Sequence, residues 1–140
     1  MIGDIRSTIV YNNGYVYFTT KGGYLYRVAM NADGTFGAVA SYNLGGAATS
    51  TPVVYKGRIY VGVCGNGGQY NADGGHHFDV LTESASGLSL AYKVSIPGYP
   101  QAAPLLSTAY ETRTLMEMAK RMDVFICILP TMQNLAVSIC

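Results

Sequence analysis

Short runs of β-branched and aromatic residues, separated by turn residues, dominate the first part of the chain. The runs Ser7–Tyr11 and Gly14–Thr20 flank an Asn-Asn-Gly turn, the residue chemistry that joins antiparallel neighbours. In Gly22–Met30 the side chains alternate between two faces until the turn Asn31–Gly34, and Phe36–Gly45 then supplies a further run. This pattern predicts a four-stranded antiparallel unit of about 43 residues.

The same pattern returns further along the chain. A shift of 43 positions aligns the two stretches without a gap, and Val16 meets Ile59 as a conservative match. A period of about 40 to 45 residues is that of a four-stranded β-propeller blade. The identical pairs are Gly3 with Gly46, Ser7 with Ser50, Thr8 with Thr51, Val10 with Val53, Gly14 with Gly57 and Tyr17 with Tyr60.

The second unit is longer than the first. The phrase "QAAPLLSTAY" is similar to "TSTPVVY", but its Pro104 follows Pro52 by 52 positions instead of 43. An insertion of about nine residues accounts for the difference, and the Gly-rich segment 65–75 is the expected place because loops tolerate added length. The runs "HHFDVLTES" and "SLAYKVSI" then complete the unit as two strands.

We therefore expect an all-β fold of consecutive four-stranded antiparallel β-propeller blades, forming an incomplete propeller with a non-native, partly helical C-terminal tail. The expected parts are an inter-blade linker at 1–6, a first blade at 7–49 and a second at 50–103. The start of a third blade is expected at 104–111, and the tail at 112–140 with a helix near 113–122.

The tail differs in character from the units before it. It has no glycine and contains Cys127 and Cys140, two of the three cysteines. Back-translation with suitable codons, read two nucleotides out of register, gives "YLYFT" and "GGIYL", which match Tyr15–Thr19 and Gly22–Tyr26. This predicts a frameshift. The shifted text also contains the spacing of a calcium loop, so calcium is expected only in a full-length parent protein and not in this chain.

The phrases "TSTPVVYKGRIYVG" and "GGYLYRVAMNADGTFGAVASYNLGG" resemble the PQQ-like (quinoprotein-type) β-propeller repeat over roughly Gly3 to Leu106. The resemblance implies a family that includes quinone-cofactor dehydrogenases, an outer-membrane assembly lipoprotein and bacterial surface proteins that bind or display. It also implies an extracellular or bacterial cell-surface location. Without tryptophan or an adjacent cysteine pair, the chain departs from the dehydrogenases, so no cofactor is expected.

Charge and hydropathy exclude several partners. The 140 residues have a net charge of +1, and only 12% are charged, so nucleic acid and polybasic membrane anchoring are not expected. No run of about twenty apolar residues predicts a membrane span, and no signal peptide is found in this chain. The three cysteines, of which Cys64 is the first, form neither a disulfide framework nor a metal knuckle.

Few residues suggest chemistry. His76 and His77, with Asp73 and Asp79 nearby, have the side chains of a metal site, but adjacent strand residues point to opposite faces, so a solvated polar loop is favoured. The glycines of 65–69 suggest a phosphate loop or, more simply, a flexible turn. Cys64 is a nucleophile candidate whose apolar setting favours a buried small hydrophobe. No catalytic, cofactor or metal residue is assigned.

Tyrosines supply the remaining signal. Tyr15 and Tyr17 share one strand face, and Tyr24 and Tyr26 share one face of the next strand, mainly for packing between blades. A minority could bind a glycan or peptide. We expect a non-catalytic binding or display fragment of a bacterial surface or secreted propeller protein that self-associates through its open blade faces. The alternative is a fragment of a quinone-cofactor oxidoreductase propeller.

Overall fold

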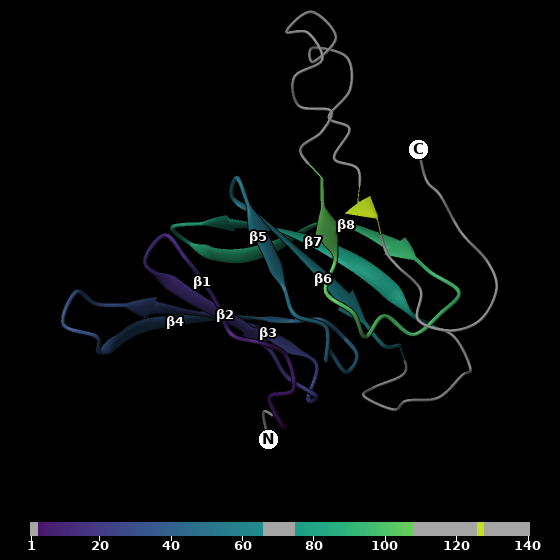
Figure 1. Cartoon of the computed structure of the whole chain (residues 1–140), viewed down its shortest axis with the longest axis horizontal. Helices are drawn as coiled ribbons and strands as arrows, with labels where there is room; N and C mark the ends of the chain where they lie inside the picture. The colour runs from purple at the N-terminus through teal and green to yellow at the C-terminus, as the bar shows by residue number, and fades with distance from the viewer. Residues whose placement is uncertain (1–2, 66–74, 108–125, 128–140) are drawn as a thin grey trace, which may run out of the picture.

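Two four-stranded antiparallel sheets form the described part of the protein, and each follows the chain order without a crossover (Figure 1). The computed structural model describes residues 3–65, 75–107 and 126–127. These residues contain no helix. The first sheet consists of β1 (Val10–Asn12), β2 (Tyr15–Thr19), β3 (Tyr24–Met30) and β4 (Phe36–Asn43), and the second of β5 (Val53–Tyr55), β6 (Arg58–Val63), β7 (His77–Ser84) and β8 (Gly87–Ser95).

The 43-residue period is visible in the backbone of the first turn of each sheet. Asn13 and Gly14 have φ angles of 48° and 81°, and Lys56 and Gly57 have 47° and 73°. Two successive residues with positive φ form the two-residue hairpin turn whose twist matches that of the flanking strands. The turn therefore repeats even where lysine replaces asparagine.

The linker before each sheet repeats as well. The Lys21 amide donates to the Asp4 carbonyl at 2.8 Å, and 43 residues later the Cys64 amide donates to the Ala47 carbonyl at 2.8 Å. Each linker is thus bonded to the end of the second strand of the sheet that it leads into. Later in the sheets, the register shifts after Val28 and, 52 residues on, after Val80.

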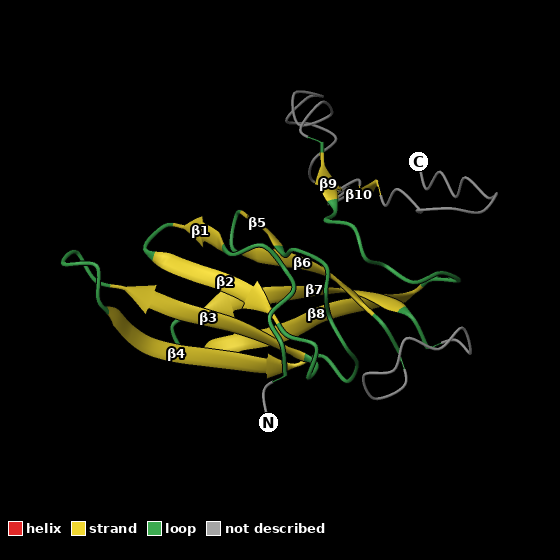
Figure 2. Ribbon diagram, turned by 60° about the horizontal axis from the view of Figure 1, so that its bottom comes forward, coloured by secondary structure: helices red, strands yellow, loops and turns green. Residues whose placement is uncertain are grey.

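The two sheets pack face to face, with β1 beside β5 and β4 beside β8 (Figure 2). Alternation along β2 and β3 directs one set of side chains toward the second sheet, where they meet alternate residues of β6 and β7. Burial of this apolar surface is the main stabilising contribution, at roughly 25 cal/mol per Å². The buried residues of this core are Tyr17, Leu25, Leu44, Ala48, Ile59, Val61, Val63 and Leu81.

A second core lies on the far face of the second sheet. Tyr60, Phe78 and Val80 are buried there, and Leu106 packs against them. Leu106 belongs to β9 (Leu105–Leu106), which pairs with β10 (Ile126–Cys127). Leu106 follows Val54 by 52 positions, and Val54 packs against the core between the sheets. Strand β9 therefore packs on the second sheet through Leu106, just as β5 packs on the first sheet through the equivalent Val54.

For the described residues, the prediction of an all-β fold with consecutive antiparallel strands is confirmed, and the propeller-blade arrangement stays a prediction. The insertion expected near 65–75 lies mostly outside the described residues. So does the helix expected near 113–122, and of the proposed tail 112–140 only β10 is described. The frameshift and the bounds of the predicted blades stay predictions.

Candidate functional site

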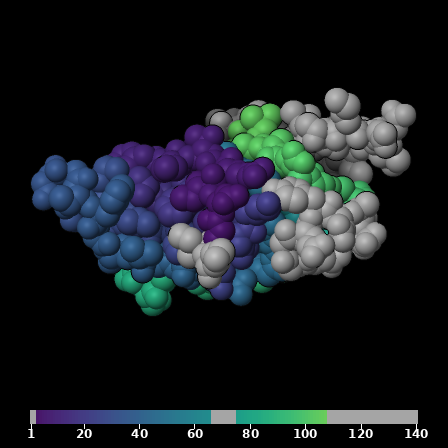
Figure 3. Space-filling view, turned by 90° about the horizontal axis from the view of Figure 1, so that it is seen from below, coloured from purple at the N-terminus to yellow at the C-terminus, as the bar shows by residue number. Residues whose placement is uncertain are grey.

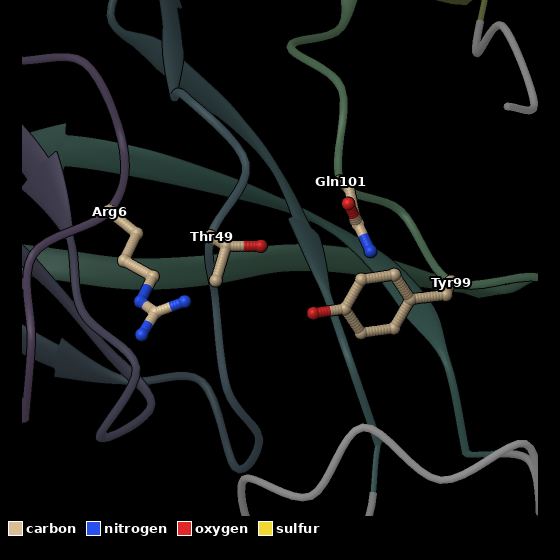
Figure 4. A pocket seen from close by; sticks show the side chains of 4 residues that line it. All are labelled: Arg6, Thr49, Tyr99 and Gln101. Carbon is tan, nitrogen blue, oxygen red and sulfur yellow. The ribbon is translucent and has the colours of Figure 1, made fainter.

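A cavity of about 390 Å³ opens where the linkers between strands meet, and we call it the linker pocket. Its walls are the side chains of Arg6, Thr49, Tyr99 and Gln101 (Figure 4). The Thr49 side chain lies between those of Arg6 and Tyr99, and the Tyr99 hydroxyl points toward it. The segments before β1 and after β8 reach the same face of the molecule (Figure 3).

Three of these four residues occupy the same position of successive repeats. Thr49 follows Arg6 by 43 residues, and Gln101 follows Thr49 by 52, the two offsets that relate the sheets and their linkers. Equivalent positions from consecutive units thus face one common space. The repeat offsets could have identified this set from the sequence, but none of the three residues attracts attention alone.

Hydrogen bonds between linkers hold the walls in place. The Thr8 amide donates to Thr51 Oγ1 at 3.0 Å, which joins two equivalent threonines 43 residues apart. Ser50 Oγ donates to the Ala102 carbonyl at 2.9 Å, and Thr19 Oγ1 donates to the Ser50 carbonyl at 2.9 Å. A pocket built on such bonded segments is largely formed before a ligand arrives, which lowers the ordering cost of binding.

The chemistry of the linker pocket is suited to binding. Among the described residues of its lining Arg6 carries the charge, and its guanidinium lies 3.7 Å from the Asp4 carboxylate, with both side chains more than half exposed. Such an exposed ion pair is weak and exchanges readily for a ligand anion. Threonine, tyrosine and glutamine add hydroxyl and amide groups that both donate and accept hydrogen bonds.

The histidine pair lies at the same end of the second sheet, but it is not the solvated loop that the sequence favoured. That expectation is wrong, because His76 and His77 are buried and Asp79 is fully buried, the last two on β7. The Gly65 amide donates to His76 Nδ1 at 3.3 Å, and the His76 ring meets Tyr99 edge to face.

His77 and Asp79 form a polar contact between the sheets. His77 Nδ1 lies 2.8 Å from the Gly75 carbonyl oxygen, and Nε2 lies 3.2 Å from the Leu44 carbonyl oxygen and 3.5 Å from Asp79 Oδ1. Lys93 Nζ lies 3.8 Å from the same carboxylate oxygen. Burial raises the pKa of Asp79, and the charges of His77 and Lys93 oppose that shift only in part.

These contacts give the metal candidates a structural role. Both ring nitrogens of His77 face oxygen atoms of the protein, and His76 accepts from a backbone amide. The described part of the chain contains no group of three metal-ligating side chains, and Asp73 lies outside it. His77 therefore ties β7 to the linker that follows the first sheet, at the Leu44 carbonyl.

The nucleophile candidate is also structural. Cys64 is fully buried at the end of β6, and burial raises the pKa of its thiol to about 12. The thiolate is the reactive form, so this side chain is inert at neutral pH. Cys64 behaves as the small hydrophobe that its apolar setting suggested.

The tyrosines divide between the two faces of the first sheet. Tyr17 is fully buried between the sheets, where packing was expected. On the outer face Tyr26 stacks on Phe18 at 5.3 Å between ring centroids and lies 6.1 Å from Tyr24. Offset and tilted pairs of this kind stabilise a sheet face by about 0.5–1.5 kcal/mol each beyond their burial.

Comparison with known proteins adds no family to this description. No protein-family model matches the chain, and no curated protein matches it either. The resemblance to the PQQ-like repeat therefore stays a prediction. Within the described residues, no helix has the length and apolar character needed to cross a membrane.

Proposed function

We propose that this chain is a non-catalytic binding module built from consecutive propeller-type blades, with the linker pocket as its ligand site. The observation that carries the proposal is the shared repeat position of Arg6, Thr49 and Gln101 around one cavity. In a propeller the equivalent positions of successive blades surround a central axis. A ligand at that axis contacts every blade, which makes it a natural binding site for such a repeat protein.

Packing between the sheets supports the blade arrangement. First strand lies beside first strand and last beside last, and the Leu106 contact continues the series toward a third unit. On the far face of the second sheet, Tyr92 and Val94 pair with Val80 and Phe78 and are 42% and 38% exposed. A further blade would cover these two side chains. Without one, copies of the chain associate through this face, which multi-angle light scattering measures as a mass above 14.9 kDa.

The lining of the linker pocket favours an acidic glycan or peptide. A carboxylate on the ligand pairs with the Arg6 guanidinium, and its hydroxyl or amide groups exchange hydrogen bonds with Thr49, Tyr99 and Gln101. Carbohydrate and peptide recognition on a bacterial surface or in a secreted protein fits this chemistry.

The proposal is tested by binding to immobilised chain, with uronate oligosaccharides and glutamate-rich peptides as the probes. Arg6→Ala and Gln101→Ala should each weaken binding by about tenfold, as expected for a loss of roughly 1.4 kcal/mol. Lys56→Ala removes an equal charge from the turn at the other end of the strands and serves as the control. If Arg6→Ala and the unmodified chain bind the probes with equal affinity, the linker pocket is not the ligand site.

A second experiment on the same protein tests the alternative that the chain is a fragment of a quinone-cofactor oxidoreductase. Pyrroloquinoline quinone is added with calcium, and the visible absorbance and the melting temperature are recorded. A binding module of the kind proposed leaves both unchanged. A saturable absorbance change that Arg6→Ala abolishes would favour the oxidoreductase instead.

A further inference from the structure

A second cavity, of about 340 Å³, lies at the opposite end of the strands from the linker pocket, and we call it the turn pocket. Its lining includes Asn13 from the turn after β1 and Ala85 from the turn after β7. Both strands begin near the linkers and run away from them, so their following turns lie at the far end. The turn pocket therefore shares no residue with the linker pocket.

One wall of the turn pocket is a largely buried ion pair between the two sheets. Arg27 Nη1 on β3 lies 3.5 Å from Glu83 Oε2 on β7 and donates to the Ser84 carbonyl at 3.1 Å. The guanidinium carbon also lies 4.9 Å from the ring centroid of Tyr15, a cation–π distance. The two charges balance, so the wall is polar but has no net charge.

Glu83 Oε2 is already engaged by protein groups. Tyr17 donates its hydroxyl to this oxygen at 2.6 Å, and Arg27 lies against the same atom. Burial, followed by the Glu83 hydrogen bond and charge, raises the pKa of Tyr17 well above its usual range, so the hydroxyl keeps its proton. Glu83 Oε2 therefore accepts from the Tyr17 hydroxyl at the wall of the cavity.

Arg27 leaves one donor unused. Its Nε is buried and has no hydrogen-bond partner among the described residues, while the whole side chain is about nine-tenths buried. A buried donor without a partner costs about 1–3 kcal/mol, more when the group is charged. Because this nitrogen is shielded, a ligand cannot reach it, and Arg27 lines the cavity with its other atoms.

We propose that the turn pocket binds a neutral saccharide unit. A sugar hydroxyl both donates and accepts, so it can accept from Arg27, donate to Glu83 and exchange either bond with the Asn13 amide. A charged ligand would compete with the Arg27–Glu83 pair, whereas a neutral polyol leaves it intact. The volume of about 340 Å³ is at the small end of ligand sites, which suits one or two sugar rings.

The first test uses saturation-transfer NMR and titration with glucose, galactose, maltose, cellobiose and lactose. Asn13→Gly removes the amide but keeps the turn, because glycine readily adopts the φ of 48° at this position. Lys56→Gly is the matched control, since Lys56 has a φ of 47° in the equivalent turn and does not line the cavity. We expect at least one sugar to bind, about tenfold more weakly to Asn13→Gly and unchanged to Lys56→Gly.

The second variant, Glu83→Gln, keeps the size of the side chain and removes its charge. It should weaken the binding of the same sugar by about tenfold or more. Its folding is checked by circular dichroism beside the Asn13→Gly result. The sugars are tested up to about 50 mM, which detects dissociation constants in the millimolar range. Absence of binding by all five sugars would overturn the proposal. So would sugar binding that Arg6→Ala abolishes and Asn13→Gly leaves unchanged, because that result assigns the sugar to the linker pocket.

Discussion

Substitution of Gly46 by alanine gives the most direct test of how the linker packs on its sheet. A Cβ at this position would lie 1.8 Å from the Cys64 carbonyl oxygen and 2.9 Å from its carbonyl carbon. Real Cβ atoms do not approach this closely, so the linker would have to move by more than an ångström. The hydrogen bond from the Cys64 amide to the Ala47 carbonyl, 2.8 Å long, would then break, and the fully buried Ala47 and Ala48 would lose their packing.

The magnitude follows from two contributions. Overpacking a close contact costs about 1–3 kcal/mol, and a buried backbone donor left without its acceptor costs about 1–3 kcal/mol. We expect Gly46→Ala to lower the free energy of unfolding by about 3–5 kcal/mol, a large part of the 5–15 kcal/mol typical of a domain. Urea unfolding followed by circular dichroism measures this loss.

The control is the neighbouring glycine. Gly45 has a φ of +80° and open space where a Cβ would lie, so Gly45→Ala introduces backbone strain without a clash. Strain of that kind costs about 1–2 kcal/mol. A loss in Gly46→Ala no larger than that in Gly45→Ala would refute the close approach of linker and strand.

Three further outcomes are expected. The Cys64 thiol, whose pKa is raised to about 12, should resist iodoacetamide at pH 8 in the folded chain and react in urea, as peptide mapping reports; rapid native labelling would contradict its burial. Burial raises the folded pKa of Asp79 above its unfolded value of 3.8, so the contribution of Asp79 to stability falls as the pH rises from the unfolded pKa toward the folded pKa. Asp79→Asn should therefore gain stability relative to the unmodified chain as the pH rises above the unfolded pKa, and a difference that does not change with pH would contradict this. Tyr17→Phe should lose about 1.5–3 kcal/mol through its bond to Glu83, and more than Tyr60→Phe at the equivalent buried ring; equal losses would argue against that bond.

Local pattern was sufficient to predict the strands. Alternation along Tyr15–Thr19 and the glycine turns required nothing beyond neighbouring residues, and the offset of 43 located the second sheet. The histidine segment was different. The two-residue spacing of His77 and Asp79 places them on one strand face, but their burial depends on the Leu44 carbonyl from the preceding linker. A tertiary contact of that kind leaves no local pattern.

The candidate sites were less accessible to sequence reasoning. Tyr17 and Glu83 are 66 residues apart and occupy positions that are not equivalent in the repeat, so no periodicity connects them. The linker pocket is the opposite case. Arg6, Thr49 and Gln101 are related by the repeat, yet they differ in size and charge, and only the convergence of three linkers makes them neighbours.

The recurring bond from linker to second strand has a consequence for how such a chain could grow. The Lys21 amide binds the Asp4 carbonyl and the Cys64 amide binds the Ala47 carbonyl, so each leading segment is tied to the sheet that follows it. The second segment is also bonded to the sheet before it, through the Ala48 amide and the Thr20 carbonyl. A gene duplication that copies from one leading segment up to the next therefore transfers a sheet together with the segment that is hydrogen-bonded to it. The number of repeats can then change by whole units, while each new unit keeps the hydrogen bond between its leading segment and its second strand.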